Sequence, residues 1–453
     1  MFVSGYVELH CHSAYSFRDG ASLPDELAAA AVRLGHHALA LTDHDGLHGA
    51  MELANAVAEA GLPLRPIIGA ELTLEDGSHL TLVAATRAGY SNLCRLITAA
   101  HAATRPKPGR EPLAPSTAYA DLARHADGLI CLSGCASRGA VARAVEGGRH
   151  ADAAAAARRL LAIFGAERLR IELQRPYGRH DRRRNRLLAQ LAERLGLRCV
   201  ATGNVHAHDR SRAALQDALV AVRLGRTLDE CESARRGNHA HVLATPAGMA
   251  ERFADHPEAV AETARVAAMV EFDLRRDLAY SYPRQGDPDA DRELAAACRA
   301  RLDDRYPHRS GLRLRADAEA RLDEELAVIR HLGLSGFFLL HRDMLELARE
   351  VAAEVRGPDT VRALLPPGRG RGSSVSSLVC YLTGLSHVDP VANDLHLGRF
   401  LNDELTAVPD IDLDFPRDIR ERLIPRVHER YGHDRSALVA SFPTYQARSA
   451  VRD

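Results

Sequence analysis

The sequence predicts an α/β fold for the N-terminal half of the chain, followed by a region with a different pattern of helices and strands. In that half, short apolar runs rich in β-branched residues alternate with longer helical patterns. Such alternation is typical of a mostly parallel sheet with helices packed outside it. Seven of these runs follow one another, which favours a sheet closed into a barrel. The 453 residues exceed one ordinary domain and fit two or three.

The order of the elements follows from the apolar runs and from the turn and capping residues between them. The expected strands are residues 7–10, 38–42, 66–72, 80–85, 129–133, 169–173 and 199–202. The expected helices are residues 23–34, 46–60, 90–103, 116–125, 138–164 and 181–195. Ser22, with Asp25 three residues later, predicts a capping box at the start of the first helix, and Gly35 predicts its end.

Composition excludes several classes of protein. Hydrophobic residues make up 46% and charged residues 26%, which is ordinary for a folded globular protein and excludes a wholly disordered chain. The net charge of −1 gives no global basic field, so any binding of nucleic acid must depend on local patches. The sequence shows no signal peptide and no apolar run of about 20 residues, so we expect a cytoplasmic protein without a membrane partner. Its 8 cysteines form no CxxC pair, which excludes a zinc ribbon.

Side chains that bind metals follow five of the expected strands. They are His10 and His12 after the first strand, Asp43 and His44 after the second, Glu71 after the third, Cys135 after the fifth and His206 after the seventh. Strand ends of an α/β barrel share one face, and imidazole and carboxylate are ligands of Zn, Mn or Fe. Any one of these residues alone equally fits a helix cap or a core position, and Asp43 in particular fits an N-cap. Their joint placement favours a metal site.

Five short segments resemble the polymerase and histidinol phosphatase (PHP) family. They are residues 10–12, 16–22, 42–45, 69–71 and 133–135. The resemblance implies a seven-stranded α/β barrel that uses Zn²⁺ or Mn²⁺ to hydrolyse phosphoesters. The ligands that it implies are His10, His12, Asp19, His44, Glu71, Cys135 and His206, with His101 as the histidine between Glu71 and Cys135. Asn204 stands where the family has Asp, which implies weaker binding of one metal, and a barrel kept for structure alone stays an alternative.

The second half of the chain begins with helical patterns. Residues from about 208 to 300 are expected to be helical, with a linker at 283–291. Residues 316–350 form a long amphipathic stretch that fits a core helix followed by a buried aromatic strand.

A glycine-rich loop, residues 366–374, then precedes an expected helix at 375–382. Its glycines allow backbone N–H groups to approach an anion, and the helix N-terminus and nearby arginines add positive charge. The loop lacks the Gly-Lys-Ser/Thr of a P-loop, which argues against a Walker ATPase.

An acidic strand is expected at residues 408–415. Period two places Asp410, Asp412 and Asp414 on one face and apolar residues on the other. Carboxylates so close together repel one another unless cations neutralise them, and two Mg²⁺ ions would meet that need. The alternative is an edge strand with a solvated acidic face.

The loop and the acidic strand, with residues 377–381, 389–390 and 399–402, resemble the palm of the bacterial C-family DNA polymerases, the DNA polymerase III α type. The resemblance implies that Asp410 and Asp412 are catalytic and bind Mg²⁺, and that Arg371, Gly372 and Ser373 bind the triphosphate of a dNTP. It also implies a DNA primer-template and other replication or repair subunits as partners. The stretch at residues 16–20 resembles the error-prone branch of the family more than the main replicase.

The resemblance also implies a domain organisation. Residues 1–285 would form the PHP barrel with a helical extension, 286–420 a partial palm, and 421–453 the start of a thumb. The third catalytic aspartate of the family would lie beyond residue 453, so this chain alone is expected not to polymerise DNA. A stand-alone PHP phosphoesterase and a non-catalytic remnant remain the alternatives.

Overall fold

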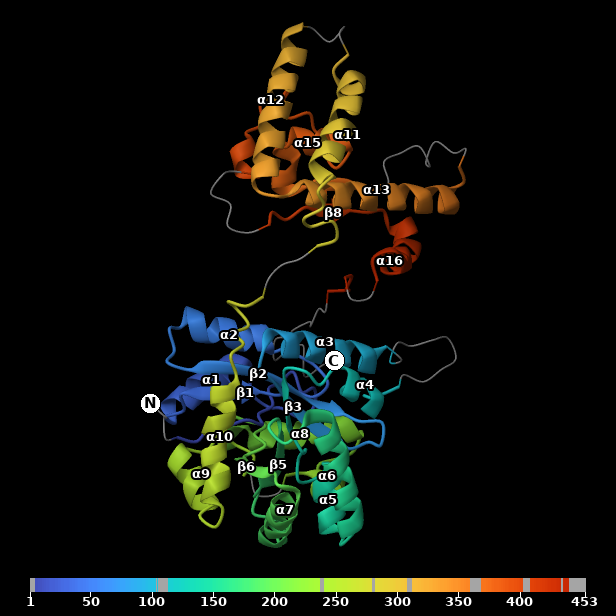
Figure 1. Ribbon diagram of the computed structural model, residues 1–453. Coiled ribbons are helices and arrows are strands. Elements are labelled where there is room, and N and C mark those ends of the chain that lie inside the picture. The colour runs from blue at the N-terminus through green and yellow to red at the C-terminus, as the bar shows by residue number, and fades with distance from the viewer. Residues whose placement is uncertain are drawn as a thin grey trace. The chain divides into compact units, whose positions relative to one another are not determined.

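The computed structural model describes residues 5–102, 104, 113–236, 240–278, 282–307, 312–358, 368–401, 408–432 and 435–439. The chain divides into two compact units, residues 1–278 and 279–453 (Figure 1). Parts of the sequence predictions lie outside the described residues, namely the first two residues of the glycine-rich loop, residue 402, and about half of the segment expected to begin a thumb.

Unit 1 is built on a curled six-stranded sheet in the order β1 to β6. Its strands are β1 (Ala38–Leu41), β2 (Arg65–Thr73), β3 (His79–Ala84), β4 (Leu129–Leu132), β5 (Leu169–Gln174) and β6 (Arg198–Thr202). Most of their residues are buried, as expected for a sheet with both faces covered. The predicted α/β class and the six strands after the first are confirmed.

The first expected strand, residues 7–10, is an extended segment that makes isolated bridges instead of a ladder. Glu8 bridges Leu39 on β1, and Cys11 bridges Val205 just beyond β6. The backbone N–H of Ala40 donates to the carbonyl oxygen of Glu8 at 2.9 Å, and Val205 N–H donates to that of His10 at 2.9 Å. This segment therefore connects the two edges of the curled sheet.

Strand β3 departs from the mostly parallel sheet that the sequence predicted. It runs antiparallel to both β2 and β4, whereas the other neighbours pair in parallel. The reversal follows from a tight turn in which Gly77 has a φ of +73°, a conformation that favours glycine. The first residue of β3, His79, consequently pairs with Thr73 and lies at the edge where the parallel strands end.

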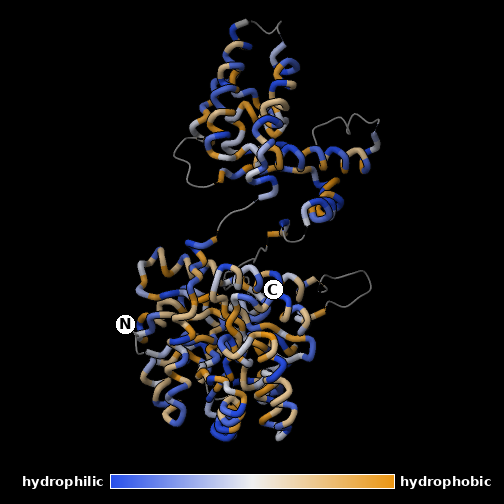
Figure 2. Tube along the Cα trace, viewed as in Figure 1, coloured by the Kyte–Doolittle hydropathy of each residue, from blue (hydrophilic) through white to orange (hydrophobic). Residues whose placement is uncertain are grey.

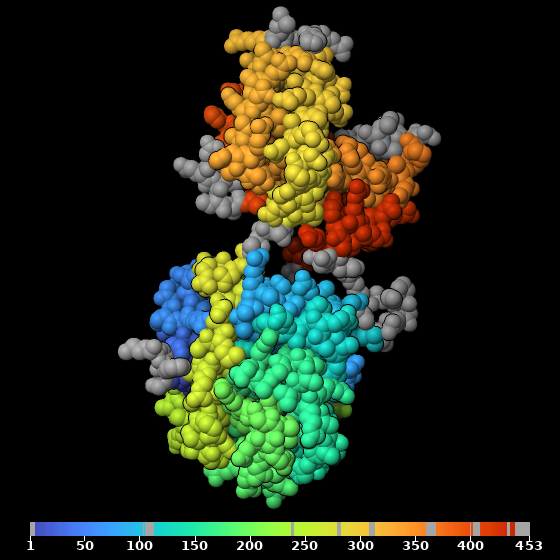
Figure 3. Space-filling model, viewed as in Figure 1, coloured from blue at the N-terminus to red at the C-terminus, as the bar shows by residue number. Residues whose placement is uncertain are grey.

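Helices cover the sheet of unit 1. They are α1 (Pro24–Arg33), α2 (Ala50–Glu59), α3 (Arg87–His101), α4 (Tyr119–Arg124), α5 (Ala140–Glu146), α6 (His150–Phe164), α7 (Asp181–Leu195), η1 (Arg210–Arg212), α8 (Ala213–Leu224), η2 (Asp229–Ala234), α9 (Pro246–Arg252) and α10 (Pro257–Met269). Figure 2 shows mostly hydrophobic residues in the centre of the unit and hydrophilic ones on its outer helical turns. In Figure 3 the yellow-green segment with α9 and α10 lies along the surface beside the green helices.

Two details of the helices differ from the sequence predictions. The helix expected at 138–164 is divided into α5 and α6, because Gly147 and Gly148 interrupt it and Gly148 adopts a φ of +72°. The capping box predicted from Ser22 and Asp25 is wrong. Glu26 accepts a hydrogen bond from the backbone N–H of Leu23 at 2.9 Å, while the hydroxyl of Ser22 contacts His208.

Unit 2 is mainly helical with one small sheet. Its elements are α11 (Ala290–Arg305), α12 (Leu312–His331), α13 (Ser335–Arg356), β7 (Arg369–Arg371), η4 (Gly372–Ser376), α15 (Leu378–Thr383), η5 (Leu397–Arg399), β8 (Asp412–Asp414) and α16 (Arg417–Tyr431). The aromatic run at Phe337 and Phe338 is buried in helix α13, so the buried strand expected there is wrong. Strands β7 and β8 pair antiparallel. No helix within the described residues is long and apolar enough to cross a membrane.

Candidate functional site

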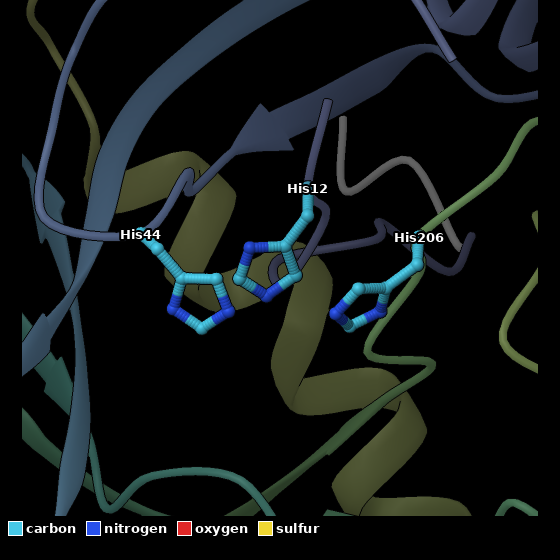
Figure 4. A group of neighbouring side chains, drawn as sticks. All are labelled: His12, His44 and His206. Carbon is cyan, nitrogen blue, oxygen red and sulfur yellow. The ribbon is translucent and has the colours of Figure 1, made fainter. Parts of the chain in front are cut away.

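Three histidines from distant parts of the chain meet in unit 1. His12 follows the extended N-terminal segment, His44 follows β1, and His206 follows β6. One ring nitrogen of each lies within 4.8 Å of the others. Figure 4 shows His12 between the other two, with ring centroids 4.4 Å from His44 and 4.3 Å from His206. The ends of strands on one side of the sheet thus place these rings together, as the strand-end pattern predicted.

Glu71, at the end of β2, adds a carboxylate to the same centre. His10 Nε2 lies 3.1 Å from His12 Nε2 and 3.4 Å from Glu71 Oε1. His44 Nδ1 lies 2.9 Å from Glu71 Oε2. Ligands of one first-row metal ion, each about 2.0–2.2 Å from it, stand about 3–3.6 Å apart. These separations therefore suit a bound ion.

Asp19 completes the group from the loop that precedes α1. Its Oδ2 lies 3.4 Å from His44 Nε2 and 3.2 Å from His206 Nε2. Of the predicted ligands, the structure therefore brings six together. They are His10, His12, Asp19, His44, Glu71 and His206.

Neighbouring acceptors fix the orientation of the histidine rings. Nδ1 of His10 contacts Glu172 at 2.6 Å, Nδ1 of His12 contacts Ser16 Oγ at 3.1 Å, and Nδ1 of His206 contacts the carbonyl oxygen of Asn204 at 2.9 Å. When each Nδ1 carries the proton and donates it, the Nε2 lone pair is directed into the centre. This is the usual arrangement around a metal-binding histidine.

Burial and charge act against each other on the pKa values of the centre. Burial lowers the pKa of His10, but Glu172 and Glu71 outweigh it and raise that pKa to about 10. For His12, burial and the neighbouring His206 and His44 hold the pKa well below its usual value. Burial opposes ionisation of Glu71, yet His44 and His10 hold its pKa well below the usual range. The carboxylate is therefore charged, and a cation is the partner that such a cluster favours.

The residues present fit a divalent metal ion. Two buried oxygens, Glu71 Oε1 and Asn204 Oδ1, accept no hydrogen bond. A cation would satisfy oxygens of this kind. Imidazole nitrogen with carboxylate oxygen is a donor set for Zn, Mn or Fe.

Two residues of the centre were not predicted from the sequence. His79 Nδ1 lies 3.0 Å from Glu71 Oε2, in a group with His44. Its position follows from the antiparallel direction of β3, which the Asp76-Gly77 turn signals. Glu172 is buried on β5 and holds His10. The available signal was an acid in a strand that was expected to be buried.

The other predicted ligands lie differently. His101 Nε2 is 2.7 Å from the carbonyl oxygen of Asp45, and His101 belongs to none of the three-residue groups found among the described residues. The thiol of Cys135 is buried and lies 3.6 Å from Ser137 Oγ. Burial raises the pKa of this thiol, and the negative charge of Glu71 raises it further. Asp43 accepts from Ser13 N–H at 2.6 Å and so has a structural role in the loop.

The acidic strand of unit 2 has the alternation that the sequence predicted. Asp410, Asp412 and Asp414 are exposed, while Ile411 is buried and Leu413 is half-buried against the core of the unit. Only Asp412–Asp414 form the paired strand β8. The acids therefore occupy one solvent-facing side.

The glycine-rich loop pairs directly with this strand. Arg371 stands opposite Asp412, with its Nη2 3.7 Å from Asp412 Oδ2 and its Nε 3.2 Å from Asp414 Oδ1. All three side chains are exposed, so these ion pairs add little stability. Ser373 is exposed, and no atom lies within 4 Å of the position that a Cβ on Gly372 would take. The loop is open to solvent beside the acids.

The helix after the loop does not present a free N-terminus, which corrects the sequence prediction. Glu325 on α12 is buried, and its carboxylate accepts from the backbone N–H groups of Leu378 at 2.9 Å and Val379 at 3.1 Å. The hydroxyl of Ser377 also donates to it, at 2.9 Å. An anion is thus already present at the start of α15, and the loop itself remains for a phosphate.

Two protein families match this chain, one in each unit. The family described as the PHP domain matches residues 8–176, which contain most of the metal centre. The family described as the bacterial DNA polymerase III alpha NTPase domain matches residues 292–453. Unit 1 thus contains a PHP domain, in agreement with its fold and its histidine–carboxylate centre.

Residues 292–453 thus match the bacterial DNA polymerase III alpha family, and the chain is similar to error-prone DNA polymerases over nearly all of its length. The error-prone DNA polymerase of Symbiobacterium thermophilum is 40% identical over 458 residues, and that of Mycobacterium tuberculosis is 39% identical over 463 residues. Each alignment covers 99% of this chain and 40% of the relative. The chain therefore spans about 40% of the length of these curated relatives.

Proposed function

We propose that unit 2 contributes the nucleotide-binding and magnesium-binding part of a DNA-directed DNA polymerase. The observation that carries this proposal is the pairing of β7 with β8, which brings Arg371 next to Asp412. Asp410 and Asp412 would hold Mg²⁺, and Arg371, Gly372 and Ser373 would hold the triphosphate of a dNTP. Bound Mg²⁺ would neutralise charge on the oxygens of the transferred phosphoryl group. The partners would be a DNA primer-template and other replication or repair subunits.

Within this proposal, residues 1–285 are the PHP domain with its helical extension. Residues 286–420 are part of the palm, and residues 421–453 begin the thumb. Arg371 is paired with Asp412 and Asp414. With Mg²⁺ held by Asp410 and Asp412, Arg371 would be available to contact the phosphates.

Binding of a fluorescent dATP analogue to this chain tests the palm proposal. We expect binding that requires Mg²⁺ and is lost in Asp410→Asn and in Asp412→Asn. Asp414→Asn, a change of the same charge on the same strand face, is the matched control and should retain binding. Equal loss in all three variants would contradict the assignment of the two metal-binding acids.

We also propose that the PHP centre hydrolyses phosphoesters with Zn²⁺ or Mn²⁺, acting on the 3′ end of DNA. The buried oxygens without donors favour this over a barrel kept for structure alone. A bound ion would polarise the phosphoester and a water molecule. Glu71 and Asp19 would hold the ion, while Ser16 and Glu172 keep His12 and His10 oriented toward it.

Hydrolysis can be measured on a 3′-recessed DNA and on bis(4-nitrophenyl) phosphate with the Mn²⁺-loaded protein. We expect release of nucleotide and nitrophenol that is abolished by His12→Ala. His125→Ala, at the end of α4, is the matched control and should stay active. Full activity of His12→Ala would contradict the assignment, and a protein that retains no metal in elemental analysis would favour the non-catalytic remnant.

A further inference from the structure

Of the side chains in the metal centre of unit 1, that of His44 is the most exposed. The side chains of His10, Glu71 and His206 are at most 2% exposed, whereas His44 is 24% exposed. His44 and Asp19 are in contact, with Oδ2 of Asp19 3.4 Å from Nε2 of His44. A substrate therefore reaches the centre from the side of these two residues.

Two arginines converge on Asp19 at this opening. Arg223, on α8, places its Nη1 3.2 Å from Asp19 Oδ1. Arg236, which follows η2, places its Nη2 2.8 Å from Asp19 Oδ2. Their side chains are 36% and 19% exposed, so both are partly open to solvent while they contact Asp19. Gln216 on α8 donates to the carbonyl oxygen of Asp19 at 3.2 Å, which ties this helix to the loop.

Arg236 also lies against the atom through which His206 would bind a metal. Its Nη2 contacts Nε2 of His206, whose other nitrogen is directed at the carbonyl oxygen of Asn204. The guanidinium therefore occupies the space in front of two predicted metal-binding atoms, Asp19 Oδ2 and His206 Nε2. A metal ion and this arginine are both cations, so they compete for the same two atoms.

An anion in the opening would remove this conflict. A guanidinium displaced from Asp19 by a metal ion needs another anionic partner, and its planar array of donors fits phosphate oxygens. We propose that Arg223 and Arg236 bind the phosphate group of the substrate at the opening of the metal centre, so that metal and phosphate bind cooperatively. This inference rests on the proposed phosphoester hydrolysis and adds the residues that recognise the phosphate.

Manganese binding, measured through the electron paramagnetic resonance of free Mn²⁺, tests the inference without any turnover. The probe for the phosphate is thymidine 5′-monophosphate. In the unmodified chain we expect the nucleotide to tighten Mn²⁺ binding about 10-fold, a coupling typical of linked sites. By reciprocity, Mn²⁺ should tighten binding of the nucleotide by the same factor.

The variants separate the two arginines from the rest of the centre. Arg236→Gln should bind Mn²⁺ more tightly than the unmodified chain when no nucleotide is present, because the competing cation is gone. Arg223→Gln with Arg236→Gln should abolish the effect of the nucleotide. Arg235→Gln removes the same charge one residue away, where Arg235 pairs with Asp217, and should behave like the unmodified chain.

The outcomes distinguish this inference from the hydrolytic function. Coupling that persists in the double variant, or Mn²⁺ binding that is unchanged or weaker in Arg236→Gln, overturns the inference even if the chain hydrolyses phosphoesters. Coupling that is lost in the double variant supports it even if no hydrolysis is found. Arg223→Gln alone changes the more exposed arginine and should weaken the coupling. This single variant keeps the inference testable if the double variant does not fold.

Discussion

Glu325 holds the start of α15 beside the glycine-rich loop, and its removal has a calculable cost. Glu325→Ala leaves the buried N–H groups of Leu378 and Val379 without their acceptor. Each such orphaned donor costs about 1–3 kcal/mol. Burial raises the pKa of Glu325, because the buried carboxylate is poorly solvated. Removal of this carboxylate therefore offsets part of the cost of the two orphaned donors. We therefore expect the free energy of opening of α15 to fall by about 3 kcal/mol.

Hydrogen–deuterium exchange measures this opening directly. Since about 1.4 kcal/mol corresponds to a factor of ten, amides of residues 372–386 should exchange about 100-fold faster in Glu325→Ala. Glu324→Ala is the matched control, because Glu324 is the exposed neighbour on the same helix. Exchange of α15 less than about 10-fold faster than in that control would refute the reasoning.

Three further changes have expected outcomes. In Gly370→Ala the new Cβ would lie 2.6 Å from the carbonyl oxygen of Leu385, so β7 must shift, and urea unfolding followed by circular dichroism should show a loss of about 2 kcal/mol. Asn204→Asp adds a carboxylate at a buried oxygen without a donor, and a Mn²⁺ titration should show about 10-fold tighter binding. The hydroxyl of Tyr15 donates to Glu52 at 2.6 Å, and this contact raises its pKa to about 12. Glu52→Gln should bring that pKa toward its ordinary value of about 10 in an ultraviolet titration.

Each of these has a result that would contradict it. Gly370→Ala with unchanged unfolding would mean that β7 has room for a side chain. Looser Mn²⁺ binding in Asn204→Asp would mean that residue 204 does not face the ion. The folded pKa of Tyr15 lies above its unfolded value, so the stabilisation by Glu52 is complete below about pH 10 and is lost toward pH 12. Equal alkaline stability of the parent and Glu52→Gln would exclude that contribution.

The strands of unit 1 could be predicted closely because a sheet buried on both faces requires apolar runs, and the sequence separates these with clear turns. The direction of β3 could not be read from its own residues, which are as apolar as those of its neighbours. The information lay in the short turn that contains Asp76 and Gly77, which favours a hairpin over a helical crossover. Gly147 and Gly148 likewise signalled the break between α5 and α6.

The candidate sites divide in the same way. Local pattern located His12 and Asp412, because each stands at a fixed place relative to a strand. His79 was missed because its position depends on the direction of β3. The sequence did not predict that the first N–H groups of α15 are already bonded. Their acceptor, Glu325, lies on another helix, and the sequence of the loop itself does not indicate so distant a partner.

The extended N-terminal segment has a consequence for the whole of unit 1. It bonds to β1 on one side and to the chain after β6 on the other, and it also supplies His10 and His12. A metal ion bound by His10 and His12 would therefore also hold the extended segment in place between the two edges of the curled sheet. Removal of the metal should therefore speed the exchange of backbone amides at both edges of the sheet together. Deletion of the first 12 residues should remove both the connection between the two edges and two of the metal-binding histidines.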